Sequence, residues 1–339
     1  MFASNENEIG GCTSFAAVGS ATQDGLSIVA QTVDERVDEV FVLSTLANLG
    51  HYRFMAVNVT YPERYPNVPH VYHGLNEKGL ALLTTAVPTV YSLNGWNYVQ
   101  HIVEILENAA TPDEAYRILT QNLKSHGLHD YGRTWTFSNA THVMAVETTN
   151  GVVAIVKSFT DGFIVQTNHF NVLTQYDEWI PSSSPTRFRR ATDLIRGNYG
   201  KLNPSIAMQI VRDRANGVNA ICNRGSTDKD GKELGTLASS IMLPSNTKPT
   251  MWTALGNPPC ANEFVQRTIE PSGAPASATP AIAISMLPNL KDEASFMPTT
   301  SEAVIMQTLG DYSVVIGVAV TSVVMLTTLT RLFRKWLST

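Results

Sequence analysis

A cysteine near the start of the chain has neighbours that suit it to nucleophilic chemistry. Cys12 follows Gly10 and Gly11, whose missing side chains permit a strained backbone and a close approach of the thiol to the preceding carbonyl. If the thiol cleaved that bond, the new α-amino group, with a pKa of about 7.7–8.0, could serve as its base. The alternative is a small buried hydrophobic residue, the commoner fate of a lone cysteine. Spacing alone favours this alternative.

Other nucleophile and metal arrangements have weaker support. A papain-like pair would need that family's local motif around the cysteine, which is absent. His70 and His73 lie in PHVYH, but no further ligand pair has a telling spacing, so we expect them at a strand rim. Cys12, Cys222 and Cys260 are far apart, which argues against a structural zinc site and against a disulfide framework. We therefore expect neither a metal nor a cofactor.

Composition limits the class of partner. The chain has 339 residues, a net charge of -5 and 43% hydrophobic residues, which is typical of a globular protein with a sizeable core. No Lys/Arg stretch is long enough to suggest a nucleic-acid-binding surface. The composition argues against nucleic acid and favours a small molecule or peptide as the substrate.

The segment that begins at Cys12 opens with strands. Three apolar runs are separated by turn signals at 23–25 and around 34–38. The runs are CTSFAAV from Cys12, LSIVAQTV from Leu26 and EVFVLSTL from Glu39. We expect these strands to pair with one another.

Two helices are expected next. The segment WNYVQHIVEILENAA repeats apolar residues with a helical period. These residues are Val99, Ile102, Val103 and Leu106. Thr111 can cap the second helix, Pro112 suits its first turn, and Glu114 completes a capping box, so about twelve helical residues should follow.

Strands and helices then alternate to about residue 268. Strands are expected in THVMAVET, GVVAIVKSF and GFIVQTNHF, with a turn at 160–162, and later in TLASSIML, TMWTALG and EFVQRTI. Helices are expected over about 187–196 and over 204–213, where Asn203 caps and Pro204 takes the first position. This order of elements predicts an α+β fold, a four-layer αββα sandwich.

Five short motifs resemble one enzyme family in their order along the chain. They are GCTSF, AQTVD, GLNEKGL, QTNHF and TMWTALGNPP, between about residues 11 and 265. Each motif alone is weak. Together they resemble the peptidase C45 branch of the N-terminal nucleophile (Ntn) hydrolases, the acyl-coenzyme A:6-aminopenicillanic acid acyltransferase-like proteins. The resemblance implies the Ntn-hydrolase fold and a precursor that cleaves itself.

The resemblance also implies roles for residues of this chain. Self-cleavage would fall between Gly11 and Cys12, with Cys12 as the catalytic nucleophile. Asp34 matches the aspartate that positions the terminal amine and supports the thiol; its alternative is a turn residue between two strands. Asn168 matches the asparagine whose amide donates to the oxyanion, and losing one such donor costs about 10²- to 10³-fold in rate. Its alternative is a turn residue at a strand end.

Four further residues are placed less directly. Gln31 is retained as in some family members, and Gln31 and Arg224 are candidate substrate-binding residues. His169 is expected to be a packed or hydrogen-bonded histidine. Arg187, in SSSPTRFRR, is expected to belong to a helix start rather than to a site. The GLNEKGL motif is expected to be a structural strand-turn-strand.

The C-terminal region differs from the rest of the chain. The stretch PSGAPASATPAIAISMLP indicates a linker. Residues 312–330 carry no charge, and nineteen helical residues reach about 28 Å, near the hydrocarbon thickness of a bilayer. They are predicted to anchor the protein in a membrane, or alternatively to form a core helix. The basic tail after them favours a catalytic domain outside the cell, whereas the absence of a signal peptide favours the cytosol.

These features predict five segments and one activity. Residues 1–11 are a leader removed by self-cleavage, 12–268 the catalytic domain, 269–311 a linker, 312–330 a transmembrane helix and 331–339 a basic tail. The expected reaction is hydrolysis of a linear amide bond in a small acylated substrate, or transfer of its acyl group to an amine, through an acyl-cysteine intermediate. The alternative is a membrane-anchored binding or scaffold protein that keeps the fold without activity.

Overall fold

Strands and four α-helices make up most of the chain that the structure describes. The computed structural model describes residues 11–37, 41–47, 51–60, 70–227, 231–256, 262–269 and 282–283. One sheet contains β1 (Cys12–Gly19), β2 (Gly25–Arg36), β10 (Gly162–Gln166), β11 (Arg224–Thr227), β12 (Glu233–Leu243), β13 (Thr250–Leu255) and β14 (Val265–Thr268). The other contains β3 (Phe41–Ala47), β4 (Phe54–Thr60), β5 (His70–Asn76), β6 (Ala81–Val87), β7 (Gly132–Ser138), β8 (Val143–Thr149), β9 (Val152–Phe159) and β15 (Ile282–Ala283). The α-helices are α1 (Tyr98–Asn108), α2 (Pro112–His126), α3 (Ser183–Gly197) and α4 (Pro204–Val211).

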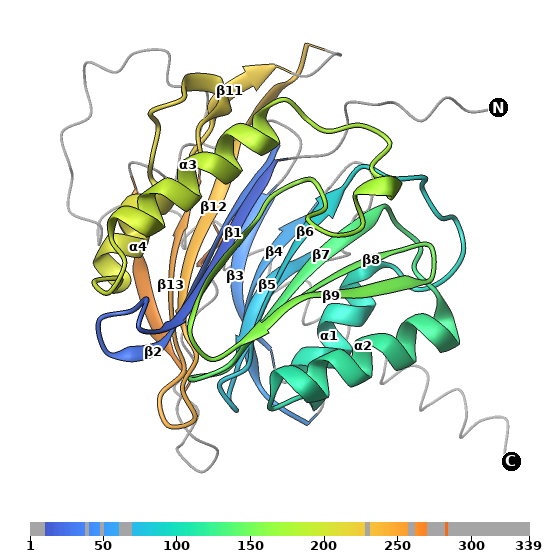
Figure 1. The fold of residues 1–339 in the computed structure, drawn as a ribbon, viewed down its shortest axis with the longest axis horizontal. Coiled ribbons are helices and arrows are strands. Elements are labelled where there is room, and N and C mark those ends of the chain that lie inside the picture. Colours follow the sequence, from blue (N-terminus) through green and yellow to red (C-terminus); the bar gives the residue numbers. More distant parts are fainter. Residues whose placement is uncertain are drawn as a thin grey trace, which may run out of the picture. The chain divides into compact units, whose positions relative to one another are not determined.

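The two sheets are the inner layers. The seven-stranded sheet has the order β10-β1-β2-β12-β13-β14, with β11 paired to β12, and the eight-stranded sheet has the order β15-β3-β4-β5-β6-β7-β8-β9. β1 and β2 face β6 of the other sheet, while α1 and α2 pack on the eight-stranded sheet and α3 and α4 on the seven-stranded one (Figure 1). This arrangement has the αββα layering predicted from the element order.

Strand β1 is buried on both of its faces. Ala16 and Val18 belong to the apolar cluster between the sheets, whereas Phe15 and Ala17 belong to a second cluster under α3 and α4. Successive side chains of a strand point to opposite faces, so each face supplies one cluster. The double burial fixes the register of β1, and with it the position of Cys12 at its first residue.

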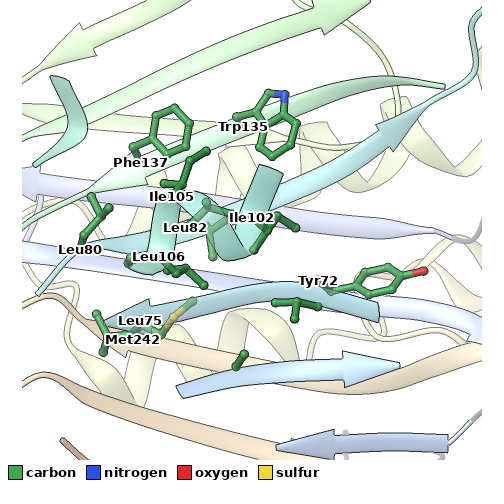
Figure 2. Close-up of a cluster of buried hydrophobic side chains, with 14 of the residues drawn as sticks. Tyr72, Leu75, Leu80, Leu82, Ile102, Ile105, Leu106, Trp135, Phe137 and Met242 are labelled. Atoms are coloured by element: carbon green, nitrogen blue, oxygen red, sulfur yellow. The ribbon is translucent and has the colours of Figure 1, made fainter. Parts of the chain in front are cut away.

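Helix α1 covers the outer face of the eight-stranded sheet with an apolar stripe. Ile102, Ile105 and Leu106 are fully buried there, next to the other side chains drawn in Figure 2. Full burial of such a side chain contributes about 1.5–3 kcal/mol. Val99 and Val103, which were expected in the stripe, are only partly buried against the same cluster. The helix was therefore predicted correctly, but its buried face is rotated.

Several sequence expectations about local structure need correction. β2 continues through Asp34 to Arg36, so Asp34 lies in a strand and not in a turn, because β12 pairs with this end of β2. The expected turn at 160–162 does link β9 to β10, which lie in different sheets. β3, however, pairs with β4 and β15 of the eight-stranded sheet, and not with β1 or β2 as expected. His73 is fully buried and hydrogen-bonds Ser240 of the facing sheet at 2.8 Å, rather than lying at a strand rim.

The helix starts were predicted in part. Thr111 accepts from the Glu114 N–H at 3.2 Å, but the Glu114 carboxylate accepts from the N–H of Ala110, so the capping box is incomplete. Asn203 caps α4 as expected, by accepting from the Ile206 N–H at 3.0 Å. α3 spans Ser183–Gly197 and so begins one turn earlier than predicted.

Two further expectations concern disulfide bonds and the predicted transmembrane helix. Cys222 is disulfide-bonded, so the expectation against disulfides is wrong; distance along the chain says little about distance in the fold. In the described ranges, no helix is long and apolar enough to cross a bilayer. Residues 312–330 lie outside those ranges, as do residues 1–10 and most of the linker, so these segments remain predictions.

Candidate active site

Cys12 is a free, buried thiol at the start of β1. Cys12 is 4% exposed. Burial raises the pKa of the thiol to about 12, and the negative charges of Asp34 and Glu35 act in the same direction. The positive charges of Arg187 and Arg133 partly oppose this shift. The thiol is therefore neutral at physiological pH and needs a base to become a nucleophile.

Gly11 and Asp34 face each other across the β1–β2 ladder. The Asp34 N–H donates to the Gly11 carbonyl at 2.6 Å, directly beyond the pairing of Cys12 with Val33. A Cβ atom built on Gly11 would collide with the Asp34 carboxylate and lie 3.2 Å from its Cγ. The carbonyl before Cys12 is thus held by a backbone donor, and the space beside it is available only to glycine.

The Asp34 carboxylate is suited to exchange protons near neutrality. Burial raises its pKa to about 7, although the nearby charge of Arg187 and a hydrogen bond from Thr236 lower it. Thr236 Oγ1 donates to Asp34 Oδ1 at 2.5 Å from the neighbouring strand β12. An acid with a pKa near the working pH can both accept and return a proton.

Asn168 holds the backbone nitrogen of Cys12. Its Oδ1 accepts from the Cys12 N–H at 2.8 Å and from Arg187 Nη2 at 2.8 Å. Because a guanidinium only donates, this contact fixes the orientation of the amide. The Asn168 Nδ2 donates to the Ala86 carbonyl at 2.8 Å. In this structure the amide oxygen therefore faces Cys12, and the predicted donation from Nδ2 to an oxyanion remains a prediction.

Arg187 completes the arrangement, although sequence analysis placed it outside the site. It is 1% exposed and donates to the Cys12 carbonyl, to Thr13 Oγ1 at 3.0 Å and to Asn168 Oδ1. Burial lowers its pKa, while the charges of Asp34 and Cys12 raise it. A signal was present in the sequence, since Arg187 occupies the buried stripe of α3. The stripe consists of Ser184, Arg187, Ala191 and Ile195.

The segment after Asn168 is tied down by buried contacts. Ser184 Oγ accepts from the Asn168 N–H at 2.8 Å and hydrogen-bonds His169 Nδ1 at 2.8 Å, which confirms His169 as a hydrogen-bonded histidine. The carboxylate of Glu147, on β8, accepts the backbone N–H groups of residues 171–173 at 2.5, 3.0 and 2.9 Å. These contacts fix Asn168 relative to both sheets.

The two predicted substrate-binding residues lie in different surroundings. Gln31 is fully buried between the sheets, and its side-chain amide hydrogen-bonds the backbone of Thr84. Arg224 is exposed at the first residue of β11. Its neighbour Asn223 pairs with Thr236, which in turn hydrogen-bonds Asp34. Neither substrate role is tested by these contacts.

A family model matches most of the folded part of the chain. The family described as acyl-coenzyme A:6-aminopenicillanic acid acyl-transferase matches residues 47–259, more than half of the chain. The matched range contains Asn168 and Arg187 but begins after Cys12 and Asp34. The roles of Cys12 and Asp34 therefore rest on their surrounding motifs and geometry.

Comparison with solved structures supports the fold. A mutant of conjugated bile acid hydrolase from Clostridium perfringens has a TM-score of 0.54 and 13% identity, over 81% of this chain and 96% of that chain. A variant of the same hydrolase has a TM-score of 0.52 and 14% identity, over 78% and 99%. No curated protein matches the sequence. The chain belongs to the acyl-coenzyme A:6-aminopenicillanic acid acyl-transferase family and has the α+β fold of an Ntn-type hydrolase.

Proposed function

We propose that the protein is a cysteine amidohydrolase that activates itself by cleavage between Gly11 and Cys12. The observation that carries this proposal is the hold on the main chain of Cys12. Asn168 accepts its N–H and Arg187 donates to its carbonyl, and both side chains are buried. Burial of an arginine is rare and demands several partners. Its use here, around the future α-amine of a cysteine, favours a catalytic role for that amine.

Self-cleavage would begin with the neutral thiol. Asp34 accepts the thiol proton, and the Cys12 sulfur attacks the carbonyl carbon of Gly11. The Asp34 N–H, 2.6 Å from the Gly11 oxygen, is a donor for the oxyanion that forms. The C–N bond then breaks, the Cys12 nitrogen takes up a proton, and a thioester joins Gly11 to the sulfur. Water hydrolyses the thioester and releases residues 1–11 with a new carboxylate.

The mature enzyme would use the new amine as its base. An α-amine with a pKa of about 7.7–8.0 can accept the thiol proton near neutral pH. The sulfur attacks the carbonyl carbon of a substrate amide, and backbone amides, together with Asn168 as predicted from the sequence, donate to the oxyanion. The substrate C–N bond breaks and its amine leaves with a proton. Water then attacks the acyl-cysteine, which yields the carboxylic acid and the free thiol.

Acyl transfer is the second candidate activity. The matched family is described as an acyl-transferase, which supports an amine instead of water as the acceptor of the acyl group. The chemistry up to the acyl-cysteine is the same for both outcomes. The ratio of acid to new amide, measured with increasing concentrations of a primary amine, distinguishes them.

Intact mass of the purified protein tests self-activation. The wild type should lose residues 1–11, whereas Cys12→Ala should keep them. Cys12→Ser is the second variant, and its weaker nucleophile should process slowly. A wild type that keeps its leader under native conditions contradicts the proposal, as does a Cys12→Ala protein that loses it.

Amide hydrolysis is tested separately on processed protein. A panel of N-acyl amines with different acyl chains should release primary amine at a rate that alkylation of Cys12 abolishes. A correctly processed protein that releases no amine from any member favours the binding or scaffold alternative.

A further inference from the structure

Strand β6 loses one of its two neighbours before it reaches the active site. β6 pairs with β7 over its whole length, from Ala81 to Val87. Its pairing with β5, by contrast, covers only Ala81 and Leu82. The backbone groups of alternate residues point to the same edge of a strand. The main chain of Thr84 and Ala86 therefore faces an edge along which β5 has left the ladder.

The side chain of Gln31 takes the place of the missing strand at Thr84. Gln31 lies on β2, in the opposite sheet, and is fully buried. Its Nε2 donates to the Thr84 carbonyl at 2.8 Å, and its Oε1 accepts from the Thr84 N–H at 3.1 Å. A carboxamide carries one donor and one acceptor edge, as a peptide group does, so it can satisfy both backbone groups. Gln31 thereby links the two sheets.

The residues that follow Thr84 hold the catalytic asparagine. Thr85 Oγ1 donates to the Thr167 carbonyl at 2.6 Å, and the Ala86 carbonyl accepts from Asn168 Nδ2 at 2.8 Å. Asn168 Oδ1 in turn accepts from the Cys12 N–H at 2.8 Å. The contacts in this chain are buried, except that of Asn168 with Ala86, which is partly buried, and a displacement of β6 is transmitted through them to the amine of Cys12.

We infer that Gln31 is a positioning residue, which acts through β6 and Asn168 on the amine of Cys12, and that it is not a substrate contact. The inference rests on the proposed function, since only a catalytic amine needs such placement. The oxygen and the nitrogen of the Gln31 amide both hydrogen-bond the backbone of Thr84. These polar groups therefore have hydrogen-bond partners without a substrate. A displacement of a catalytic group by about 1 Å can lower the rate about 10²-fold.

The test compares Gln31→Met with a matched control, Asn76→Leu. Met keeps the length of Gln and loses both hydrogen bonds. Asn76 is also a buried amide bonded only to backbone in the contacts described, and it lies at the other end of the β5–β6 hairpin. Gln31→Met should slow self-cleavage by about 10- to 100-fold at a temperature where both proteins are folded. Asn76→Leu should lower the melting temperature and leave the self-cleavage rate unchanged.

Self-cleavage separates positioning from substrate binding because it needs no added substrate. If Gln31→Met raises KM and leaves both kcat and self-cleavage unchanged, Gln31 is a substrate contact and the inference is wrong. Equal self-cleavage rates for Gln31→Met and Asn76→Leu also overturn it.

A conservative variant supplies a pH signature. In Gln31→Glu, the neutral carboxylic acid can donate to the Thr84 carbonyl and accept from its N–H, whereas the ionised form can only accept. The self-cleavage rate of this variant, divided by that of the wild type at the same pH, should therefore fall as the pH rises. A ratio that does not change with pH contradicts the role assigned to these two hydrogen bonds.

Hydrogen exchange makes the inference independent of activity. Gln31→Met should increase exchange in a peptide covering 84–87, and Asn76→Leu should not. A wild type that keeps its leader would refute the proposed function, while unchanged exchange at 84–87 would refute the inference about Gln31. The two failures are therefore distinguishable.

Discussion

At the residue scale, the surroundings of the peptide bond before Cys12 depend on the absence of a side chain at Gly11. The Asp34 carboxylate occupies the space that a side chain at position 11 would need. The same carboxylate has a pKa raised to about 7 by burial, and its backbone N–H holds the Gly11 carbonyl. In the proposed mechanism Asp34 thus provides both the proton acceptor and an oxyanion donor, and both roles depend on glycine at position 11.

Gly11→Ala should block this arrangement. The added Cβ would collide with the Asp34 carboxylate and displace the carbonyl from the Asp34 N–H, so self-cleavage should slow by about 100-fold or more. Gly197→Ala is the control, because a Cβ at Gly197 meets no atom within 4 Å. The measurement is the fraction of unprocessed chain against time, by intact mass. Equal processing of the two variants would show that Gly11 is not needed.

The rate of self-cleavage should rise with pH through about 7, since Asp34 must be ionised to accept the thiol proton and burial raises its pKa to that value. Thr236→Val should move the midpoint to higher pH, because the lost hydrogen bond stabilises the ionised carboxylate. Precursor refolded at acidic pH and then transferred to a series of higher pH values provides both profiles. A midpoint unaffected by Thr236→Val would exclude Asp34 as the base.

At the scale of elements, the site is assembled from segments that are distant in sequence. Cys12 is on β1, Asp34 on β2 and Arg187 on α3, while Asn168 follows β10. α3 contributes through its buried stripe, where Arg187 reaches the backbone of Cys12. In the proposed mechanism the helix therefore helps to position Cys12, which packing alone does not require.

Arg187→Met should destabilise the fold by about 2–4 kcal/mol, because Asn168 Oδ1 and the Cys12 carbonyl lose a buried, charged donor. Arg190→Met, on the same helix, is the control. Arg190 pairs with Asp213, but its side chain is 34% exposed, and its loss should cost less than about 1 kcal/mol. Urea unfolding followed by circular dichroism gives both values. A smaller loss for Arg187→Met than for Arg190→Met would contradict the assigned contacts.

Sequence patterns predicted the layers better than they predicted the site. Strand and helix periods depend on burial, so the αββα order followed from apolar spacing. The end of β2 was missed because polar residues such as Asp34 break the apolar pattern even where the strand remains paired. Arg187 was missed because its place in the buried stripe of α3 does not by itself identify its partners, and Cys12 and Thr13 lie 175 and 174 residues away.

At the scale of the whole molecule, residues 312–330 are proposed as a membrane anchor. Deletion of residues 310–339 should release the protein from membranes, so that it is found in the supernatant after membranes are washed at alkaline pH. Val320→Lys keeps the length of the chain and places one charge near the middle of the span, which costs about 2.5–3.5 kcal/mol of insertion free energy and should weaken anchoring. If the shortened chain aggregates while the full chain is soluble without detergent, the segment is a core helix instead.

The ladder contact between Gly11 and Asp34 has a consequence for the order of events. In the proposed mechanism, Gly11 presents the first carbonyl that the thiol attacks, so the leader is a tethered first substrate. The α-amine is created when the C–N bond breaks, and hydrolysis of the thioester then releases the leader and vacates the Asp34 N–H, 2.6 Å from where the Gly11 carbonyl oxygen had been. On this mechanism the leader would fill the active site of the precursor until processing is complete, and a substrate amide could enter only the processed enzyme.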